Sequence, residues 1–137
     1  MLLSLDENEA AQTSVRRSLT LRESIEDKEG MIYGLAVLSH CARIAQDWDT
    51  AILHDTRRLE LAIVLEKDVL RMEALADMAH AQASLGELGT ASEMYQESLD
   101  LAKRLEDPAG HLVASWGIAD LAEIEMRYND ALLALSD

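Results

Sequence analysis

The sequence is poor in the residues that interrupt helices and in the aromatic residues that fill many cores. Its 137 residues include no phenylalanine, one proline, six glycines and only 4% aromatic residues. Scarcity of glycine and proline favours helices, because these two residues destabilise helix interiors most strongly. Apolar residues, chiefly Ala and Leu, make up 49% of the chain. The sequence therefore predicts one all-α domain with enough apolar side chains to bury a core.

The chain also lacks the cysteines, long apolar runs and basic leader that mark other protein classes. A single cysteine, Cys41, excludes an internal disulfide and a cysteine cluster for a metal, so we expect a small buried apolar residue there. The longest apolar runs fall far short of the roughly 20 residues that span a bilayer. Residues 1–5 lack the basic and long apolar regions of a signal peptide. We therefore expect a soluble, cytoplasmic protein.

Basic residues are few. Lys and Arg number 12 against 26 for Asp and Glu, which gives a net charge of −14. Such a surface repels the phosphates of nucleic acids and anionic lipids, so neither is an expected partner. Residues 1–69 carry 8 basic and 13 acidic groups, whereas residues 70–137 carry 4 and 13. The C-terminal half is therefore the more acidic one.

What the chain does contain is an internal repeat of 40 residues. Ten residues recur unchanged 40 positions later: Leu35, Ala36, His40, Thr50, Ala51, Leu59, Leu61, Ala62, Leu65 and Glu66. A fixed period of this size is typical of a solenoid, in which each unit buries its apolar face only against its neighbours. Within a period the apolar residues follow helical spacing, as at Leu35, Leu38 and Ala42. Each period therefore predicts two helices.

The predicted elements form a single domain over residues 1–137 with about seven helices. We expect them at 6–27, 30–46, 48–66, 69–85, 89–106, 109–126 and 128–136. The units are an unpaired helix 6–27, a repeat 30–69, a repeat 70–109 and a truncated repeat 110–137. Gly30 and Gly86 mark two breaks, and Asp107 precedes Pro108 as a helix cap precedes the first helical residue.

The segment 86–91, Gly-Glu-Leu-Gly-Thr-Ala, followed by Tyr95 and Leu99, resembles the turn and second helix of a tetratricopeptide repeat. That family places small residues where the paired helices cross and alanine early in the second helix. The matching positions here are Ser39, Ala79 and Ala119, and Ala11, Ala51, Ala91 and Ala131. The resemblance implies a right-handed α-solenoid of antiparallel helix pairs, of a long-repeat type because the usual period is about 34. Armadillo and HEAT repeats are the alternative helical solenoids.

In that family the first helix of each pair lines a concave surface. Carried over, the resemblance implies a groove that mixes aromatic and acidic groups: Tyr33, Val37, His40, Glu73, Asp77, His80, Trp116, Asp120 and Glu123. Trp116 replaces Ala36 and Ala76 of the other repeats, so it is either a binding anchor or a core residue. An acidic groove favours a basic or amphipathic protein segment. We therefore expect a protein-interaction module or scaffold. The alternative is a ligand-sensing or oligomerising regulatory domain of a larger bacterial-type regulator.

No pattern of residues indicates catalysis or metal binding. The sequence has no GxSxG, glycine-rich phosphate loop, HExxH or paired CxxC. Carboxylates two residues apart, such as Glu123 and Glu125, do not face each other on a helix. His40 and His80 lie one period apart and could share a metal, but duplication of a surface histidine is the favoured explanation. We expect neither an enzyme nor a cofactor nor a metal site.

The two ends of the predicted stack are apolar. Residues with too few neighbours in one chain are Ile118, Leu121, Ala122, Leu132 and Leu133 at the C-terminal end, and Leu2, Leu3, Leu5 and Val15 at the N-terminal end. Solenoids need polar caps for solubility. We therefore expect self-association, most simply a two-fold dimer that joins like ends, with Ile118, Leu121, Leu132 and Leu133 at the contact.

Overall fold

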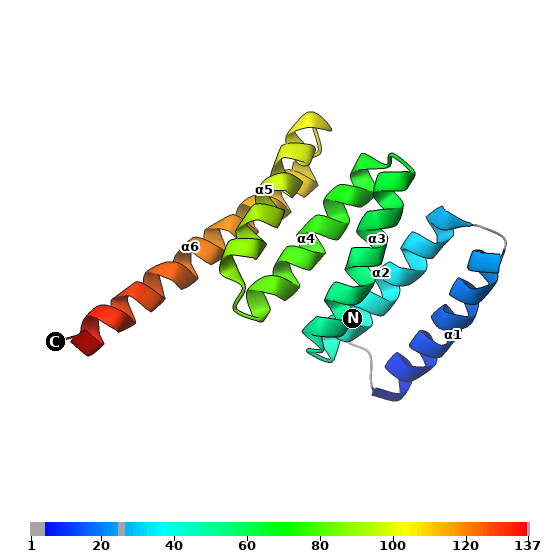
Figure 1. Ribbon diagram of the computed structural model, residues 1–137, viewed down its shortest axis with the longest axis horizontal. Helices are drawn as coiled ribbons and strands as arrows, with labels where there is room; N and C mark the ends of the chain where they lie inside the picture. The colour runs from blue at the N-terminus through cyan, green and yellow to red at the C-terminus, as the bar shows by residue number, and fades with distance from the viewer. Residues whose placement is uncertain (1–4, 25–26, 137) are drawn as a thin grey trace.

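The computed structural model describes residues 5–24 and 27–136, and every regular element in these residues is a helix. The helices are α1 (Leu5–Ser24), α2 (Lys28–Ile44), α3 (Trp48–Val64), α4 (Asp68–Ser84), α5 (Leu88–Arg104) and α6 (Pro108–Ser136). Each packs antiparallel to its neighbour in the chain, which gives a solenoid-like array (Figure 1). The prediction of an all-α array of antiparallel helices is confirmed. Leu2 and Leu3 lie outside the described residues.

Four turns recur every 20 residues and set the helix length of 17 in α2 to α5. In each, one residue adopts a positive φ: Gln46 at 58°, Glu66 at 54°, Gly86 at 87° and Glu106 at 52°. The following residue donates its N–H back to the preceding helix, as from Asp47 to the carbonyl of Ala42 at 2.9 Å. This is the Schellman arrangement, which satisfies carbonyls that a helix end leaves free.

Aspartates begin three of the helices as caps. Asp27, Asp47 and Asp107 accept hydrogen bonds from the backbone N–H groups of residues 30, 50 and 110, at 2.9, 3.3 and 3.1 Å. Each satisfies a donor that the first helical turn leaves without a partner. The expected cap at Asp107 before Pro108 is confirmed.

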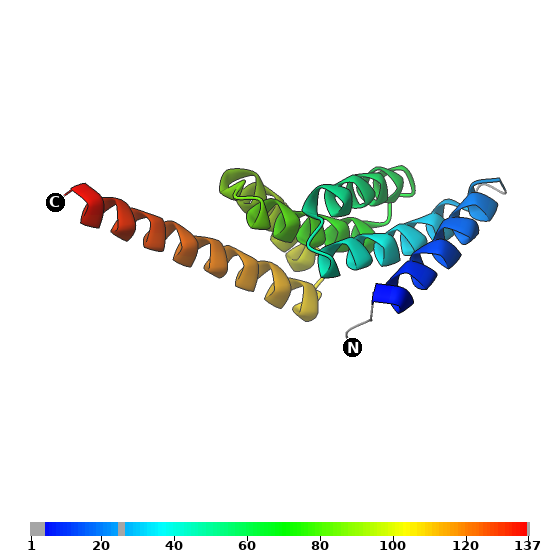
Figure 2. The ribbon, with the colours of Figure 1, turned by 90° about the horizontal axis from the view of Figure 1, so that it is seen from below.

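The predicted break between residues 126 and 128 is wrong, because α6 runs without interruption from Pro108 to Ser136. By the 20-residue spacing, Met126 would have to adopt the left-handed conformation and Arg127 would have to cap the next helix. Good helix formers occupy these positions in the other turns, as Glu66 and Lys67 show, so the residue types at 126 and 127 do not by themselves decide the outcome. This segment differs at Glu125, which stands where the other turns carry Ala45, Leu65, Leu85 and Leu105. Six helices therefore occur in the described residues, not seven, and the C-terminal part of α6 projects beyond the array (Figure 2).

Helices that are second neighbours in chain order, such as α4 and α6, also touch, but only on one side of the array. α4 packs against α6, and α2 approaches α4, whereas α1, α3 and α5 make no such contacts among the described residues. The array therefore has two layers, with α2, α4 and α6 in the more closely packed one. All nine predicted groove residues belong to this layer.

The core follows the predicted small-residue positions in the α2/α3 and α4/α5 pairs. Ser39, Ala51, Ala79 and Ala91 are all 0% exposed, and Cys41 is buried as expected. Ala119 and Ala131, the equivalent positions in α6, are exposed. They would meet only if the chain reversed between them, and the straight α6 keeps them apart.

One residue expected at an exposed end lies in the core instead. Leu121 is only 4% exposed and packs with Ala79, Ala91 and Tyr95. The prediction of exposure is wrong for Leu121, because the stripe of α6 that contains it faces α4 and α5. Ile118 is partly buried beside this cluster, and Val15 is half-buried. Leu132 and Leu133 are 64% and 66% exposed, as expected.

Candidate functional site: an acidic groove between α4 and α6

Three of the nine predicted groove residues lie on each of three helices. Tyr33, Val37 and His40 belong to α2, Glu73, Asp77 and His80 to α4, and Trp116, Asp120 and Glu123 to α6. All are exposed except Asp77, which is half-buried. Trp116, 68% exposed, is a surface residue and not part of the core. Trp48, by contrast, packs against the cluster of Ala42, Ala51 and Ala81.

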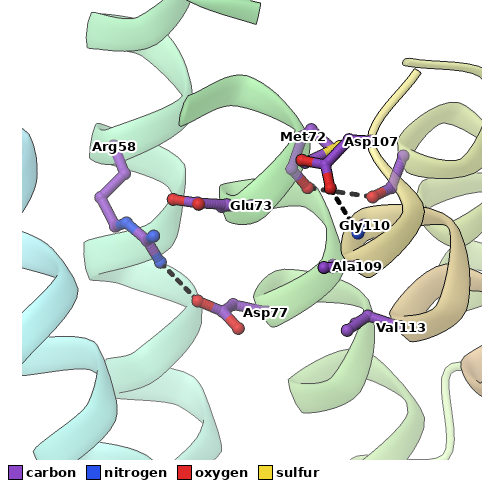
Figure 3. Close-up of a pocket in the computed structure, with 10 residues that line it drawn as sticks. Arg58, Met72, Glu73, Asp77, Asp107, Ala109, Gly110 and Val113 are labelled. Carbon is purple, nitrogen blue, oxygen red and sulfur yellow. Dashed lines mark hydrogen bonds and ion pairs between the residues drawn. The ribbon is translucent and has the colours of Figure 1, made fainter. Parts of the chain in front are cut away.

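Successive clefts of about 340 Å³ and about 180 Å³ lie between α4 and α6, and together we call them the α4/α6 groove. The first contains Glu73, Asp77 and Asp107 (Figure 3). The second contains His80 and Asp120. Four of the nine predicted residues are therefore brought to one groove. α5 supplies a residue to each cleft, Ser98 in the first and Tyr95 in the second.

The predicted residues on α2 are not part of this groove. Tyr33 lines a separate cleft of about 420 Å³ with Lys67, at the turn between α3 and α4.

The ring of His80 packs edge-on against Trp48, with centroids 5.6 Å apart and an interplanar angle of 83°. His80 therefore belongs to an aromatic contact between α3 and α4. No group of three or more His, Cys, Asp or Glu side chains placed to hold a metal occurs among the residues that the structure describes.

Behind the groove, a cluster of charged side chains connects α2, α3 and α4. Nη1 of Arg58 donates to Oδ1 of Asp55 and to Oδ2 of Asp77, both at 2.8 Å. Arg43 lies 3.6 Å from Asp55 and 3.7 Å from Asp77, and it donates to the hydroxyl of Ser39 at 2.7 Å. Asp55 and Arg58 are 0% and 4% exposed. Two arginines and two aspartates thus hold three helices together, with Asp77 at the groove wall.

Burial and ion pairing have opposite effects on the pKa values of Asp55 and Arg58. Burial raises the pKa of the Asp55 carboxyl, although hydrogen bonds with Ser39 and Arg58 favour its charged form. Burial alone would lower the pKa of Arg58, but the bonds to Asp77 and Asp55 outweigh it and raise that pKa. Arg58 therefore stays charged and needs its acidic partners.

Arg43, Asp55 and Arg58 are not among the site residues predicted from the sequence. The 40-residue frame contains a signal for two of them, because Asp55 and Arg58 occupy the positions of Tyr95 and Ser98 in the next repeat. Tyr95 and Ser98 are buried, and so are Asp55 and Arg58. Charged residues at two core positions of a repeat predict a buried ion pair, because an isolated buried charge is too costly.

The groove carries negative charge that the chain itself does not neutralise. Glu73 and Asp120 have no ion-pair partner among the described residues. Burial raises the pKa of the Tyr95 phenol, and the charges of Asp120 and Asp77 raise it further. The electrostatic field of the groove therefore favours a cation.

No known family model matches the chain, and no curated protein matches it. No helix in the described ranges is long and apolar enough to cross a membrane.

Proposed function

We propose that this chain is a protein-interaction module that binds a basic or amphipathic segment in the α4/α6 groove. The observation that carries the proposal is the pair of carboxylates without ion-pair partners, Glu73 and Asp120, one in each cleft of the same groove. A charged groove that continues through two clefts suits an extended or helical segment better than a compact substrate. The proposal is therefore one of binding and includes no catalysis.

The tetratricopeptide-like interpretation belongs to this proposal. It is supported by the buried small residues Ser39, Ala51, Ala79 and Ala91 at the helix crossings and by the position of the groove in the closely packed layer. A right-handed superhelix of long repeats is the finer form of the same proposal. Members of that family that grip acidic tails use basic grooves, so the partner proposed here has the opposite charge.

A second candidate function is self-association of a regulatory domain. The observation that favours it is the apolar stripe of α6, in which Leu121 and Ile124 pack on the array. Tyr128 and Leu135 continue the same face at helical spacing and are 63% and 85% exposed. A second copy of the chain could cover this continuation.

The leading proposal is tested by selecting peptides from a random displayed library against the immobilised chain at low salt. We expect enrichment of Lys and Arg, and binding that weakens strongly when salt rises well above about 0.1 M, where the screening length is about 10 Å. Asp120→Lys should abolish binding of the selected peptides. Glu93→Lys, an equal charge change at an exposed position of α5, should preserve most of it. A selection that yields no binder, or binders indifferent to salt and to Asp120→Lys, rejects the proposal.

A further inference from the structure

The first cleft of the groove combines three carboxylates with a buried arginine. We propose that it receives a basic side chain, Lys or Arg, of the bound segment, while Arg58 donates a hydrogen bond to a backbone carbonyl of that segment. This inference rests on the proposed function and specifies the chemistry of the partner.

The acidic part of the cleft is arranged around a central space. Glu73 and Asp77 lie one turn apart on α4, and Asp107 lies across from them at the start of α6 (Figure 3). Asp77 is already bonded to Arg58, and Asp107 accepts a hydrogen bond from the N–H of Gly110. Glu73 has neither an ion pair nor a side-chain hydrogen bond in the described residues. It is therefore the carboxylate most available to a cation.

The incomplete hydrogen bonding of Arg58 is a second, independent observation. Its side chain is 4% exposed and lies at the wall of the cleft, yet both of its hydrogen bonds come from Nη1. Nε is buried without a hydrogen-bond partner, and Nη2 makes no hydrogen bond within the described residues. Nε is enclosed by protein atoms, so Nη2 is the donor of this guanidinium that an acceptor on a ligand in the cleft would use. A donor without a partner is costly, so the guanidinium favours a ligand that brings an acceptor.

These two features together select a peptide over a simple cation. A simple cation would satisfy Glu73 but would offer no hydrogen-bond acceptor to Arg58. A basic residue within a peptide offers a cationic head for Glu73 and a backbone carbonyl for Arg58.

The walls and size of the cleft agree with a long aliphatic stem. Met72, Ala76 and Val113 contribute apolar surface, and the volume of about 340 Å³ lies at the lower end of typical small-ligand sites. Lys and Arg side chains bury their methylene groups along such surfaces and keep the charged head in a polar place. An isolated metal ion would leave most of this space and all of the apolar surface unused.

The test follows backbone amide shifts of the 137-residue chain, labelled with ¹⁵N, as each of four small probes is added. The probes are N-acetyl-arginine N-methylamide, its lysine analogue, its uncharged citrulline analogue, and ethylguanidinium, which lacks carbonyls. We expect shifts centred on Ala76, Gly110 and Val113 with the arginine or lysine probe, and the stronger of the two identifies the residue. Citrulline should bind at least about tenfold more weakly, because it lacks the charge. The Arg58 Nε–H signal should move with the blocked amino acids and not with ethylguanidinium.

Matched variants separate the cleft from the overall charge. Glu73→Gln should weaken binding of the charged probe about fivefold, the effect of one partly exposed ion pair. Glu93→Gln changes the net charge equally and should leave binding unchanged. Because Glu73 is exposed and unpaired, thermal unfolding should show that its variant remains folded. Equal binding of citrulline, equal binding by Glu73→Gln, or shifts elsewhere on the chain would overturn this inference. If library-selected peptides still bind in a way that depends on Asp120, the proposed function survives that result.

Discussion

The ring of Tyr95 on α5 lies directly against the backbone of Gly117 on α6. A Cβ atom at Gly117 would come within 2.3 Å of Cζ of Tyr95, far inside van der Waals contact. Tyr95 is 6% exposed, so its ring has little room to move. The close approach of α5 and α6 therefore depends on the missing side chain at this position.

Gly117→Ala should lower the free energy of unfolding by about 1–3 kcal/mol, the usual cost of overfilling a packed site. This loss should exceed the gain of up to about 1 kcal/mol that alanine brings to a helix interior. Gly89→Ala is the matched control, because a Cβ there meets nothing within 4 Å. Denaturant unfolding measures both variants, and equal stability of the two would refute the contact.

Asp55→Ala should destabilise the chain by about 3–5 kcal/mol, because it leaves the buried charge of Arg58 with only Asp77 as a direct partner. Glu60→Gln removes the acid of an exposed pair with Arg57 at 3.7 Å and should change stability by less than about 0.5 kcal/mol. Chemical denaturation at neutral pH distinguishes them. A small effect at Asp55 would mean that the cluster does not hold α2, α3 and α4 together.

His54 should make stability depend on pH. Burial lowers its pKa from the ordinary value of 6.5, so the folded chain binds this proton less tightly than the unfolded chain. The stability that neutral His54 contributes to the folded chain is therefore fully present above pH 6.5. It is lost as the pH falls through the lowered folded-state pKa. His54→Gln should reduce the difference in stability between about pH 5.5 and about pH 7.5. His111→Gln, at an exposed position, serves as the control, and identical pH profiles for parent and His54→Gln would contradict the prediction.

The exposed leucines of α6 should control the association state if the second candidate function is correct. Leu132→Lys combined with Leu133→Lys should shift the chain toward monomer in sedimentation equilibrium, because charge disfavours burial of this surface. Leu53→Lys, at a position of α3 that is 69% exposed, is the control and should not change the association state. A parent chain that is strictly monomeric at high concentration would remove this candidate.

The groove residues show how far a repeat pattern predicts a site. The pattern placed Glu73, Asp77, His80 and Asp120 on the right helices, because a helix of known register determines which residues share a face. It also included Tyr33, which instead lines a separate cleft near the turn between α3 and α4. Which faces meet around a cleft depends on how helices cross, and that is not a property of any one helix.

Three features were predictable from the amino-acid sequence: the all-helical content, the number of helices up to residue 108 and the small residues at the helix crossings. These features are local or recur at a fixed spacing, so helix propensity, capping and periodicity are enough to predict them. Three further features became visible only in the folded chain: the pairing of Arg58 with Asp55 and Asp77, the burial of Leu121 and the unbroken course of α6. Those outcomes depend on contacts between separate helices, or on whether a helix continues past a site without a stop signal, and the energies involved arise only once the helices are packed.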